Sequence, residues 1–307
     1  MRGFLFFISM CVFGNVVSIH AAILHISDLR AVHPYIKDGG VVCLCIEETL
    51  IFAKESLGHL RWYEHQNLQL EKKVSKDIAR EQALREWLGI SMLATFELGT
   101  PDLPSVFSEL AFSGASVLGV SLCPLPFIPR SLSILEGLSL DFTQFPTVFE
   151  NGWISHPKTL GKPLETPVVE KNIFFTGILA NQLTMEEAML ALFSTAQPLP
   201  TQIVYVDHSL QRLESTEKAC KQMQVPFVGL CYTPAQKRAE KFHFKVAELQ
   251  RTRMLSLFSE EFYSALLESF TKKNTEEKGF EPPVPVRELL ISNQTHSTTL
   301  PLFHREK

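Results

Sequence analysis

Five short runs of apolar residues constrain the fold of this chain more than any other feature. Each run is rich in β-branched or aromatic residues. None shows the alternation of apolar and polar residues that is typical of a strand with one solvent-exposed face. Continuous apolar runs are typical of strands covered on both faces, as in a parallel sheet. The runs are VVCLCI (41–46), ASVLGVS (115–121), NIFFTG (172–177), QIVYVD (202–207) and VPFVGLCY (225–232). We therefore predict a five-stranded, mostly parallel sheet.

Helical patterns separate these runs, for example over residues 186–194 and 210–223. Strand, helix and strand in this rhythm indicate a doubly wound α/β fold. A charged stretch over residues 70–89 predicts a helix that ends at Gly89. It lies within an insertion after the first strand, about residues 54–110, which we interpret as a helical cap.

Three more segments complete this interpretation of the chain. Residues 124–170 predict loops, a short helix at 132–138 and room for a β-hairpin. Pro234 begins two helices, with a break near Ser259 that can cap the second. Residues 272–307 turn polar and proline-rich, which predicts a mobile tail and leaves one α/β domain over residues 23–271.

The N-terminus has the layout of a secretory signal peptide over residues 1–22. Arg2 precedes an apolar segment over residues 4–17, and Ala21 and Ala22 offer a cleavage point. A retained anchor is the alternative, although the apolar segment is short beside the roughly 20 residues of a membrane span. Since no later segment is apolar enough to span, we expect an exported protein, periplasmic or secreted, which stays anchored only if the leader is kept.

Composition narrows the classes of function. With 307 residues, 45% hydrophobic and 20% charged, the chain can bury a large core. The net charge of -4, or 28 - 33 = -5 once Arg2 is removed, offers no basic face for nucleic acid. Five widely spaced cysteines remain without the leader, which does not indicate a disulfide framework.

Polar residues follow several of the predicted strands. The first run leads into Cys45-Ile46-Glu47-Glu48-Thr49, the second ends at Ser121, the third at Thr176, and the fourth at Asp207-His208. Ligands of open α/β sheets bind outside the carboxyl ends of the strands. These residues therefore predict either a shared site or ordinary turn residues.

The order of these pieces resembles the haloacid dehalogenase (HAD) superfamily, whose members are mostly Mg-dependent phosphohydrolases and phosphotransferases. More narrowly, the chain resembles an uncharacterised, exported HAD-like family of intracellular bacteria of the chlamydial type. The narrower resemblance rests on LGHLRWY (57–63), ILEGLSLDF (134–142), NIFFTG (172–177), IVYVDHSLQRLESTEKAC (203–220) and VPFVGLCYT (225–233). It covers residues 40–265.

The resemblance assigns a role to each strand-end position. Cys45 stands where the family has the nucleophilic, metal-binding Asp, and Glu47 stands where it has the general acid. Thr49 matches the motif's Thr, Ser121 the hydroxyl that binds the phosphoryl group, and Asp207 the first of two metal-binding acids.

Several of the family's catalytic groups are therefore missing. His208 replaces the second acid, and LANQLTMEE (179–187) has no Lys or Arg where the family has its phosphate-binding Lys. Mg²⁺ needs several hard oxygen ligands, and a thiol is a soft one. Losing nucleophile, ligand and cation together removes most of the electrostatic stabilisation of phosphoryl transfer.

The resemblance thus implies a catalytically degenerate pseudoenzyme that binds a small phosphorylated ligand or a protein partner, with no cofactor. The alternative is a residual metal-dependent, acid-phosphatase-like phosphohydrolase that uses Glu47, Ser121 and Asp207 with Mg²⁺. A zinc site from Cys45, Asp207 and His208 is a further alternative, because these residue types suit zinc.

Other nucleophile patterns fit less well. Cys45 would need a lowered pKa to act as a thiolate, and the neighbouring Glu47 and Glu48 disfavour one. The spacing of Cys123 and Arg130 is one residue too long for a cysteine-phosphatase loop, whose amides the intervening prolines would also remove. Gly119-Val120-Ser121 lacks the second glycine of a serine-hydrolase elbow.

Overall fold

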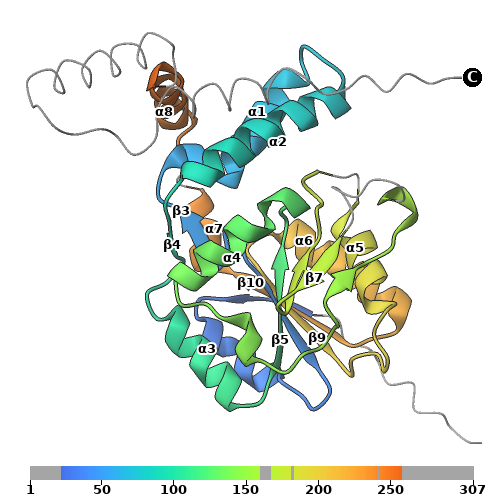
Figure 1. The fold of residues 1–307 in the computed structure, drawn as a ribbon. Helices are drawn as coiled ribbons and strands as arrows, with labels where there is room; N and C mark the ends of the chain where they lie inside the picture. Colours follow the sequence, from blue (N-terminus) through green and yellow to red (C-terminus); the bar gives the residue numbers. More distant parts are fainter. Residues whose placement is uncertain (1–21, 160–166, 181–182, 241, 258–307) are drawn as a thin grey trace, which may run out of the picture. The chain divides into compact units, whose positions relative to one another are not determined.

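The computed structural model describes residues 22–159, 167–180, 183–240 and 242–257 (Figure 1). The chain divides into two units, residues 1–250 and 251–307, and the fold below is that of the first. Of the second unit, only residues 251–257 at the end of the last helix are described. The leader before Ala22, the break near Ser259 and the polar tail from residue 272 lie outside the described residues.

The described residues form a mixed α/β fold around a large, mostly parallel sheet (Figure 1). Its eight strands lie in the order β1-β10-β9-β2-β5-β8-β7-β6, and only the pairs β8–β7 and β7–β6 are antiparallel. The strands are β1 (Ala22–Ile26), β2 (Val41–Cys45), β5 (Ser116–Ser121), β6 (Gly152–Trp153), β7 (Val168–Glu170), β8 (Ile173–Phe175), β9 (Ile203–Asp207) and β10 (Phe227–Tyr232).

All five predicted runs are strands of this sheet, namely β2, β5, β8, β9 and β10. Every residue of β2, β9 and β10 is buried, as expected for strands covered on both faces. The predicted number of strands is wrong within the described residues, because β1, β6 and β7 add to the sheet. Ala22, assigned to the leader, is the first residue of β1 and lies opposite Val228 of β10.

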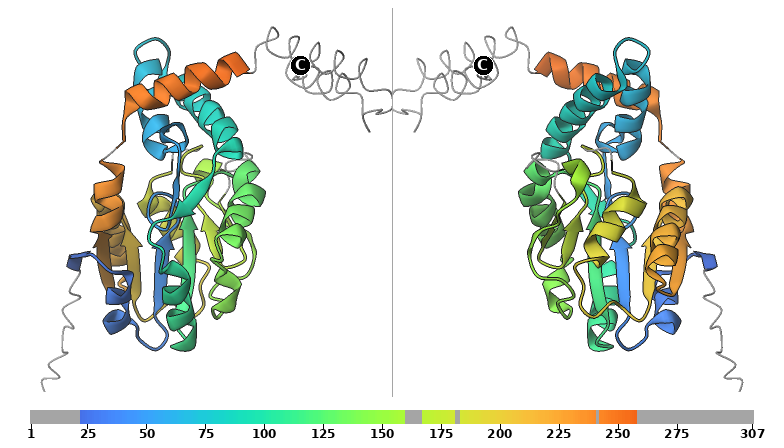
Figure 2. Two further views of the ribbon diagram at one scale, coloured as in Figure 1. Left: turned by 90° about the vertical axis from the view of Figure 1, so that its left-hand side faces the viewer. Right: turned by 90° about the vertical axis from the view of Figure 1, so that its right-hand side faces the viewer.

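Helices cover both faces of the sheet, with α3 and α4 on one side and α5 and α6 on the other (Figure 2). The predicted helices at 186–194 and 210–223 are confirmed as α5 and α6. The helices are α1 (Leu60–Leu70), α2 (Lys76–Leu93), α3 (Leu103–Phe112), α4 (Ile128–Gly137), α5 (Met185–Phe193), α6 (Leu210–Met223), α7 (Thr233–Ala239) and α8 (Phe244–Leu257). Short 3-10 helices include η1 (Leu29–Tyr35), η3 (Leu125–Phe127), η4 (Phe142–Gln144) and η5 (Pro157–Thr159).

Local sequence explains where the helices beside the strand ends begin. The Ser209 side chain accepts the Arg212 N–H and caps α6, which follows β9 almost at once. Thr184 and Glu187 form a reciprocal capping box at the start of α5. Such caps fix the direction in which each helix leaves the sheet.

The insertion after β2 is a pair of helices on a narrow stalk. Strands β3 (Ile51–Ala53) and β4 (Phe96–Leu98) pair antiparallel, and α1 and α2 pack together beyond them. The single predicted helix over residues 70–89 is wrong, because the chain turns at residues 71–75 and α2 runs past Gly89 to Leu93. Gly89 lies inside α2 and therefore marks no helix boundary.

Within the described residues, no helix has both the length and the apolar composition that crossing a membrane would require.

Candidate functional site

The loop after β2 is a tight turn that brings polar side chains to the carboxyl edge of the sheet. The carbonyl of Ile46 accepts the backbone N–H groups of Thr49, Leu50 and Ile51. Glu48 takes a left-handed conformation with φ of 53°. This turn directs Glu47 toward β5 and Thr49 toward β9, so the side chains of one loop reach both neighbouring strands.

Cys45 ends β2 as a buried, uncharged thiol. Its side chain is 0% exposed, and its Sγ lies 3.7 Å from the carbonyl oxygen of Glu47, to which it donates. Burial raises the pKa of the Cys45 thiol well above its ordinary value, and the negative charge of Asp207 raises it further. A thiolate nucleophile needs the opposite environment.

Glu47, which follows β2, and Ser121, which ends the neighbouring strand β5, are hydrogen-bonded to each other. The Ser121 hydroxyl donates to Glu47 Oε1 at 2.6 Å, and the Leu122 N–H donates to Oε2 at 2.9 Å. The Cys123 thiol lies 3.3 Å from Oε1. Burial raises the pKa of Glu47, although these donors oppose the shift. Glu47 and Ser121, predicted as general acid and phosphate-binding hydroxyl, thus satisfy each other's hydrogen bonds.

Thr49 makes the corresponding link to the end of β9. Its Oγ1 lies 3.1 Å from Nδ1 of His208 and accepts the His208 backbone N–H at 3.3 Å. The His208 side chain is buried, and burial lowers its pKa. The imidazole is therefore biased toward its neutral form.

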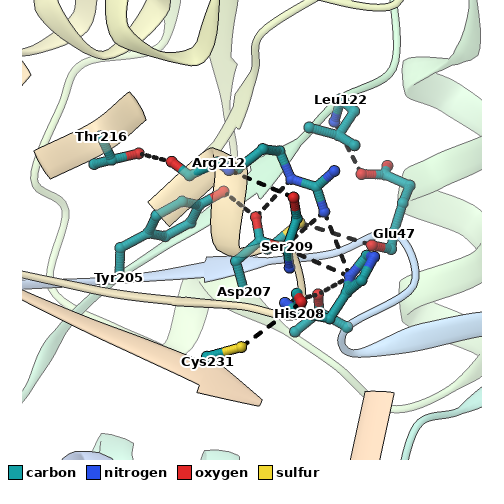
Figure 3. Close-up of polar contacts among 11 residues, drawn as sticks. Glu47, Leu122, Tyr205, Asp207, His208, Ser209, Arg212, Thr216 and Cys231 are labelled. Carbon is teal, nitrogen blue, oxygen red and sulfur yellow. Dashed lines mark hydrogen bonds and ion pairs between the residues drawn. The ribbon is translucent and has the colours of Figure 1, made fainter. Parts of the chain in front are cut away.

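Asp207 at the end of β9 is paired with Arg212 of α6 (Figure 3). Arg212 Nε donates to Oδ2 and Nη2 donates to Oδ1, both at 2.7 Å. The Tyr205 hydroxyl and the Ser209 N–H add bonds of 2.8 Å, so both carboxylate oxygens accept two donors. Burial alone would raise the pKa of Asp207, but the charge and hydrogen bonds of Arg212 lower it below its ordinary value.

The structure thus brings the predicted site residues to one edge of the sheet. We call them, with His208 and Arg212, the strand-end cluster: Cys45, Glu47, Thr49, Ser121, Asp207, His208 and Arg212. Six of them form two hydrogen-bonded groups, Glu47 with Ser121 and Asp207 with Arg212, His208 and Thr49, and the Cys45 thiol donates to the Glu47 carbonyl. All except Arg212 are at most 7% exposed.

Sequence analysis did not identify Arg212. Ser209 predicts that a helix starts directly after β9, and the third residue after such a cap lies in the first turn, beside the strand end. A basic residue there can pair with an acid that ends the strand. This signal was present in the sequence.

The zinc alternative has no geometric support in the part of the chain that the structure describes. There, no group of three or more His, Cys, Asp or Glu side chains is placed to hold a metal ion. A metal would have to bind the carboxylate oxygens of Asp207. These oxygens already accept hydrogen bonds from Arg212, Tyr205 and Ser209, and Arg212 balances their charge. Magnesium would meet the same competition at this carboxylate.

A basic side chain does reach the start of α5, although residues 179–187 contain none. Lys158 of η5 lies with its Nζ 2.7 Å from Oε1 of Glu187, in the first turn of that helix. Its charge is thus balanced by a carboxylate of the same helix turn.

The cap docks on the strand ends through contacts that the sequence did not predict. Glu48 accepts the Leu60 N–H at 2.7 Å at the start of α1, and its Oε1 lies 3.3 Å from His59 Nδ1. Burial would raise the pKa of Glu48, but His59 lowers it below its ordinary value. Tyr63 of α1 also donates to the Leu179 carbonyl at 3.3 Å.

Helix α2 of the cap also contacts the core. Arg130 of α4 donates to the Ala94 carbonyl at 2.8 Å, just past the end of α2. The Trp87 ring of α2 packs on Phe127 with centroids 6.0 Å apart. The cap is therefore held to the core from both of its helices.

The fold and the cluster define a class: an α/β protein with a mostly parallel sheet, a two-helix insertion after β2, and a buried, internally paired polar cluster at the strand ends. More particularly, the chain belongs to the family described as "Protein of unknown function (DUF2608)", whose sequence profile matches residues 22–263.

Three relatives carry the name "Putative outer membrane protein". One from Chlamydia pneumoniae is 35% identical over 267 residues, covering 87% of this chain and 97% of the relative. One from Chlamydia muridarum is 24% identical over 230 residues, covering 73% and 80%. One from Chlamydia trachomatis is 22% identical over 202 residues, covering 64% and 69%. No solved structure is significantly similar to the chain.

Proposed function

We propose that this chain is an exported protein with a HAD-like domain that has lost phosphoryl-transfer chemistry and acts by binding a ligand or a protein partner. The order of β2, β5, β8, β9 and β10, with an insertion after β2, supports the HAD-like assignment. The names of the relatives support export, as does the leader-like start of the sequence.

The pairing of Asp207 with Arg212 is the observation that carries this proposal. In a HAD phosphatase the corresponding Asp holds Mg²⁺, which neutralises charge on the transferring group. Here a guanidinium occupies both carboxylate oxygens at 2.7 Å. A fixed side-chain cation balances the charge of Asp207 but offers no coordination position for a phosphate oxygen or an attacking water.

The other cluster residues support the same conclusion. Cys45 is a buried thiol with a raised pKa, so it is a poor nucleophile at neutral pH. Glu47 and Ser121, which would act on a leaving group and a phosphate, are hydrogen-bonded to each other at 2.6 Å. A substrate would have to break this bond before either group could serve.

Hydrolysis of p-nitrophenyl phosphate by the purified full chain, with Mg²⁺, Mn²⁺ or Zn²⁺ in turn, tests the proposal. We expect a rate no higher than that of Asp207→Asn, with an active HAD phosphatase as positive control. Metal-dependent turnover that Asp207→Asn abolishes, in a variant whose circular dichroism is unchanged, would establish the residual phosphohydrolase instead.

A further inference from the structure

The helical cap has a free end, which is the turn that joins its two helices (Figure 1). Helix α1 ends at Leu70 and α2 begins at Lys76. Between them the N–H groups of Lys73 and Val74 donate to the Leu70 carbonyl at 2.8 and 3.0 Å, which closes the turn. The contacts that hold the cap to the core lie at the opposite ends of both helices. The turn is therefore a projection with a defined backbone.

Apolar side chains at this turn are exposed instead of packed. Leu68 is 59% exposed, Val74 37% and Ile78 46%. The buried face of α2 is made by other residues, among them Ala79 and Ala83. Single exposed apolar residues are common on protein surfaces, but three of them on one projecting turn form a candidate contact surface.

Three lysines accompany these apolar side chains. Lys72, Lys73 and Lys76 are exposed, and none of them forms an ion pair with another described residue. Lys72 Nζ donates only to an uncharged partner, Gln69 Oε1, at 3.0 Å. Residues 66–80 carry four basic and two acidic side chains, or 4 - 2 = +2, whereas the whole chain has a net charge of -4. The turn is thus a basic region of an acidic protein.

Both acidic side chains of this segment have partners other than these lysines. Glu71 Oε1 accepts the Asn67 side-chain amide at 3.0 Å, and Asp77 Oδ1 lies 4.0 Å from Arg80 Nη1. The three lysine ammonium groups therefore face solvent and are available to an external anion.

Exposed apolar side chains beside unpaired lysines match the interface of a membrane that contains anionic lipids. At such an interface apolar side chains enter the boundary between headgroups and acyl chains, while lysine stems lie along it and the ammonium groups contact phosphates. A fluid surface accepts a projecting turn without a complementary groove, which a protein partner would have to supply.

We propose that this turn docks the protein on the surface of an anionic phospholipid membrane. We call it the cap tip and define it by six residues: Leu68, Lys72, Lys73, Val74, Lys76 and Ile78. The three apolar side chains enter the membrane interface, and the three lysines bind lipid phosphates. None of the six residues belongs to the strand-end cluster, so the proposal is independent of the function proposed above.

Fluorescence of a tryptophan placed at the cap tip tests this proposal in the full chain. Leu68→Trp is mixed with vesicles of phosphatidylcholine and phosphatidylglycerol whose acyl chains carry bromine, which quenches a tryptophan that reaches them. We expect quenching beyond that of the wild type, which rises with vesicle concentration and is weaker with phosphatidylcholine alone.

Phe112→Trp is the matched control, because Phe112 ends α3 outside the cap and is 96% exposed. Absence of additional quenching in Leu68→Trp, or equal quenching in Phe112→Trp, overturns the proposal in favour of a protein partner for the tip.

Charge variants made in the Leu68→Trp chain test the lysines. Lys72→Gln with Lys73→Gln should raise the vesicle concentration at half-maximal quenching by about fivefold for each lysine replaced. Lys37→Gln with Lys171→Gln makes the same change in net charge at exposed lysines outside the cap and should leave that concentration unchanged. All these chains share one N-terminus, so any contribution of the leader is the same in each. Equal shifts in the two pairs would refute the assignment.

Discussion

Replacing Arg212 with methionine removes the guanidinium that pairs with Asp207 and keeps much of the apolar side chain. Asp207 is 0% exposed and accepts two Arg212 bonds of 2.7 Å, so the variant buries an unpaired carboxylate. Removing one partner of such a pair destabilises a protein by about 3–5 kcal/mol. Each kcal/mol corresponds to roughly 2–4 °C in a domain of this size, so we expect Tm to fall by about 6–20 °C.

Two further variants separate this effect from a general loss of charge. Arg85→Met removes one partner of an exposed pair with Glu81, whose side chains are 69% and 60% exposed, and should cost less than about 1 kcal/mol. The double variant Asp207→Asn, Arg212→Met removes both buried charges and should recover roughly half or more of the lost stability.

Urea unfolding followed by circular dichroism measures all of these differences. Because the pKa of Asp207 is lowered, the pair stabilises the fold above the ordinary Asp value near 3.8 and ceases to do so as the pH falls through the folded value. The gap between wild type and Arg212→Met should therefore be full at neutral pH and shrink in acid. A loss no larger than that of Arg85→Met, or no recovery in the double variant, would refute the reasoning.

Three further predictions follow from individual residues. Cys45 is 0% exposed, so iodoacetamide should modify it only after unfolding in urea, and mass spectrometry that finds native Cys45 labelled would contradict its burial. Burial raises the pKa of Glu47, so stability should fall as pH rises from the unfolded value near 4.5 through the folded one. Glu47→Gln should flatten this slope in urea unfolding, and an unchanged slope would count against the shift. Arg130→Met should cost about 1–2 kcal/mol and speed hydrogen exchange in the last turn of α2, because the Ala94 carbonyl loses its donor; equal acceleration in β9 would indicate global destabilisation instead.

The sequence was sufficient to predict most of the sheet because its central strands are buried on both faces. Continuous apolar runs mark β2, β9 and β10 without ambiguity, and all their residues are buried. Short or half-exposed edge strands carry no such mark: β6 has two residues, and two of the five residues of β1 are exposed. The two edge strands β1 and β6, together with the three-residue β7 beside β6, therefore accounted for the error in the strand count.

The helical insertion was predicted in place but not in shape. The charged stretch after Leu70 has helical composition throughout, and composition does not show that a chain reverses at residues 71–75. Contact between α1 and α2 decides the reversal, together with anchors such as the Trp87 Nε1 bond of 3.1 Å to the Gly58 carbonyl. Such contacts between residues far apart in sequence are not visible in local periodicity.

The candidate site shows the same division between what strand ends predict and what packing decides. Placing Glu47, Ser121 and Asp207 at one edge needed only the carboxyl ends of parallel strands. Their hydrogen-bond partners could not be assigned in this way, because the position of a strand end does not show which neighbouring side chains, here Arg212 and Tyr205, will pair with an acid there. Those partners determine the protonation of Asp207, and so the chemistry that the edge can support.

Competition between Arg212 and a divalent cation gives the strongest argument against ordinary HAD catalysis. For Mg²⁺ to bind Asp207, the guanidinium must leave two bonds of 2.7 Å inside a largely buried cluster. Breaking a buried ion pair costs about 3–5 kcal/mol. A cost of this size would lower the affinity of Asp207 for Mg²⁺ by a factor of roughly 10² to 10³ or more. Cys45 is a neutral, soft ligand, whereas Mg²⁺ prefers hard oxygen ligands such as carboxylates. The thiol therefore weakens the binding of Mg²⁺ further. Under the function proposed above, replacing Cys45 with aspartate alone would leave Arg212 on Asp207, so metal-dependent activity would require changing Cys45 and Arg212 together.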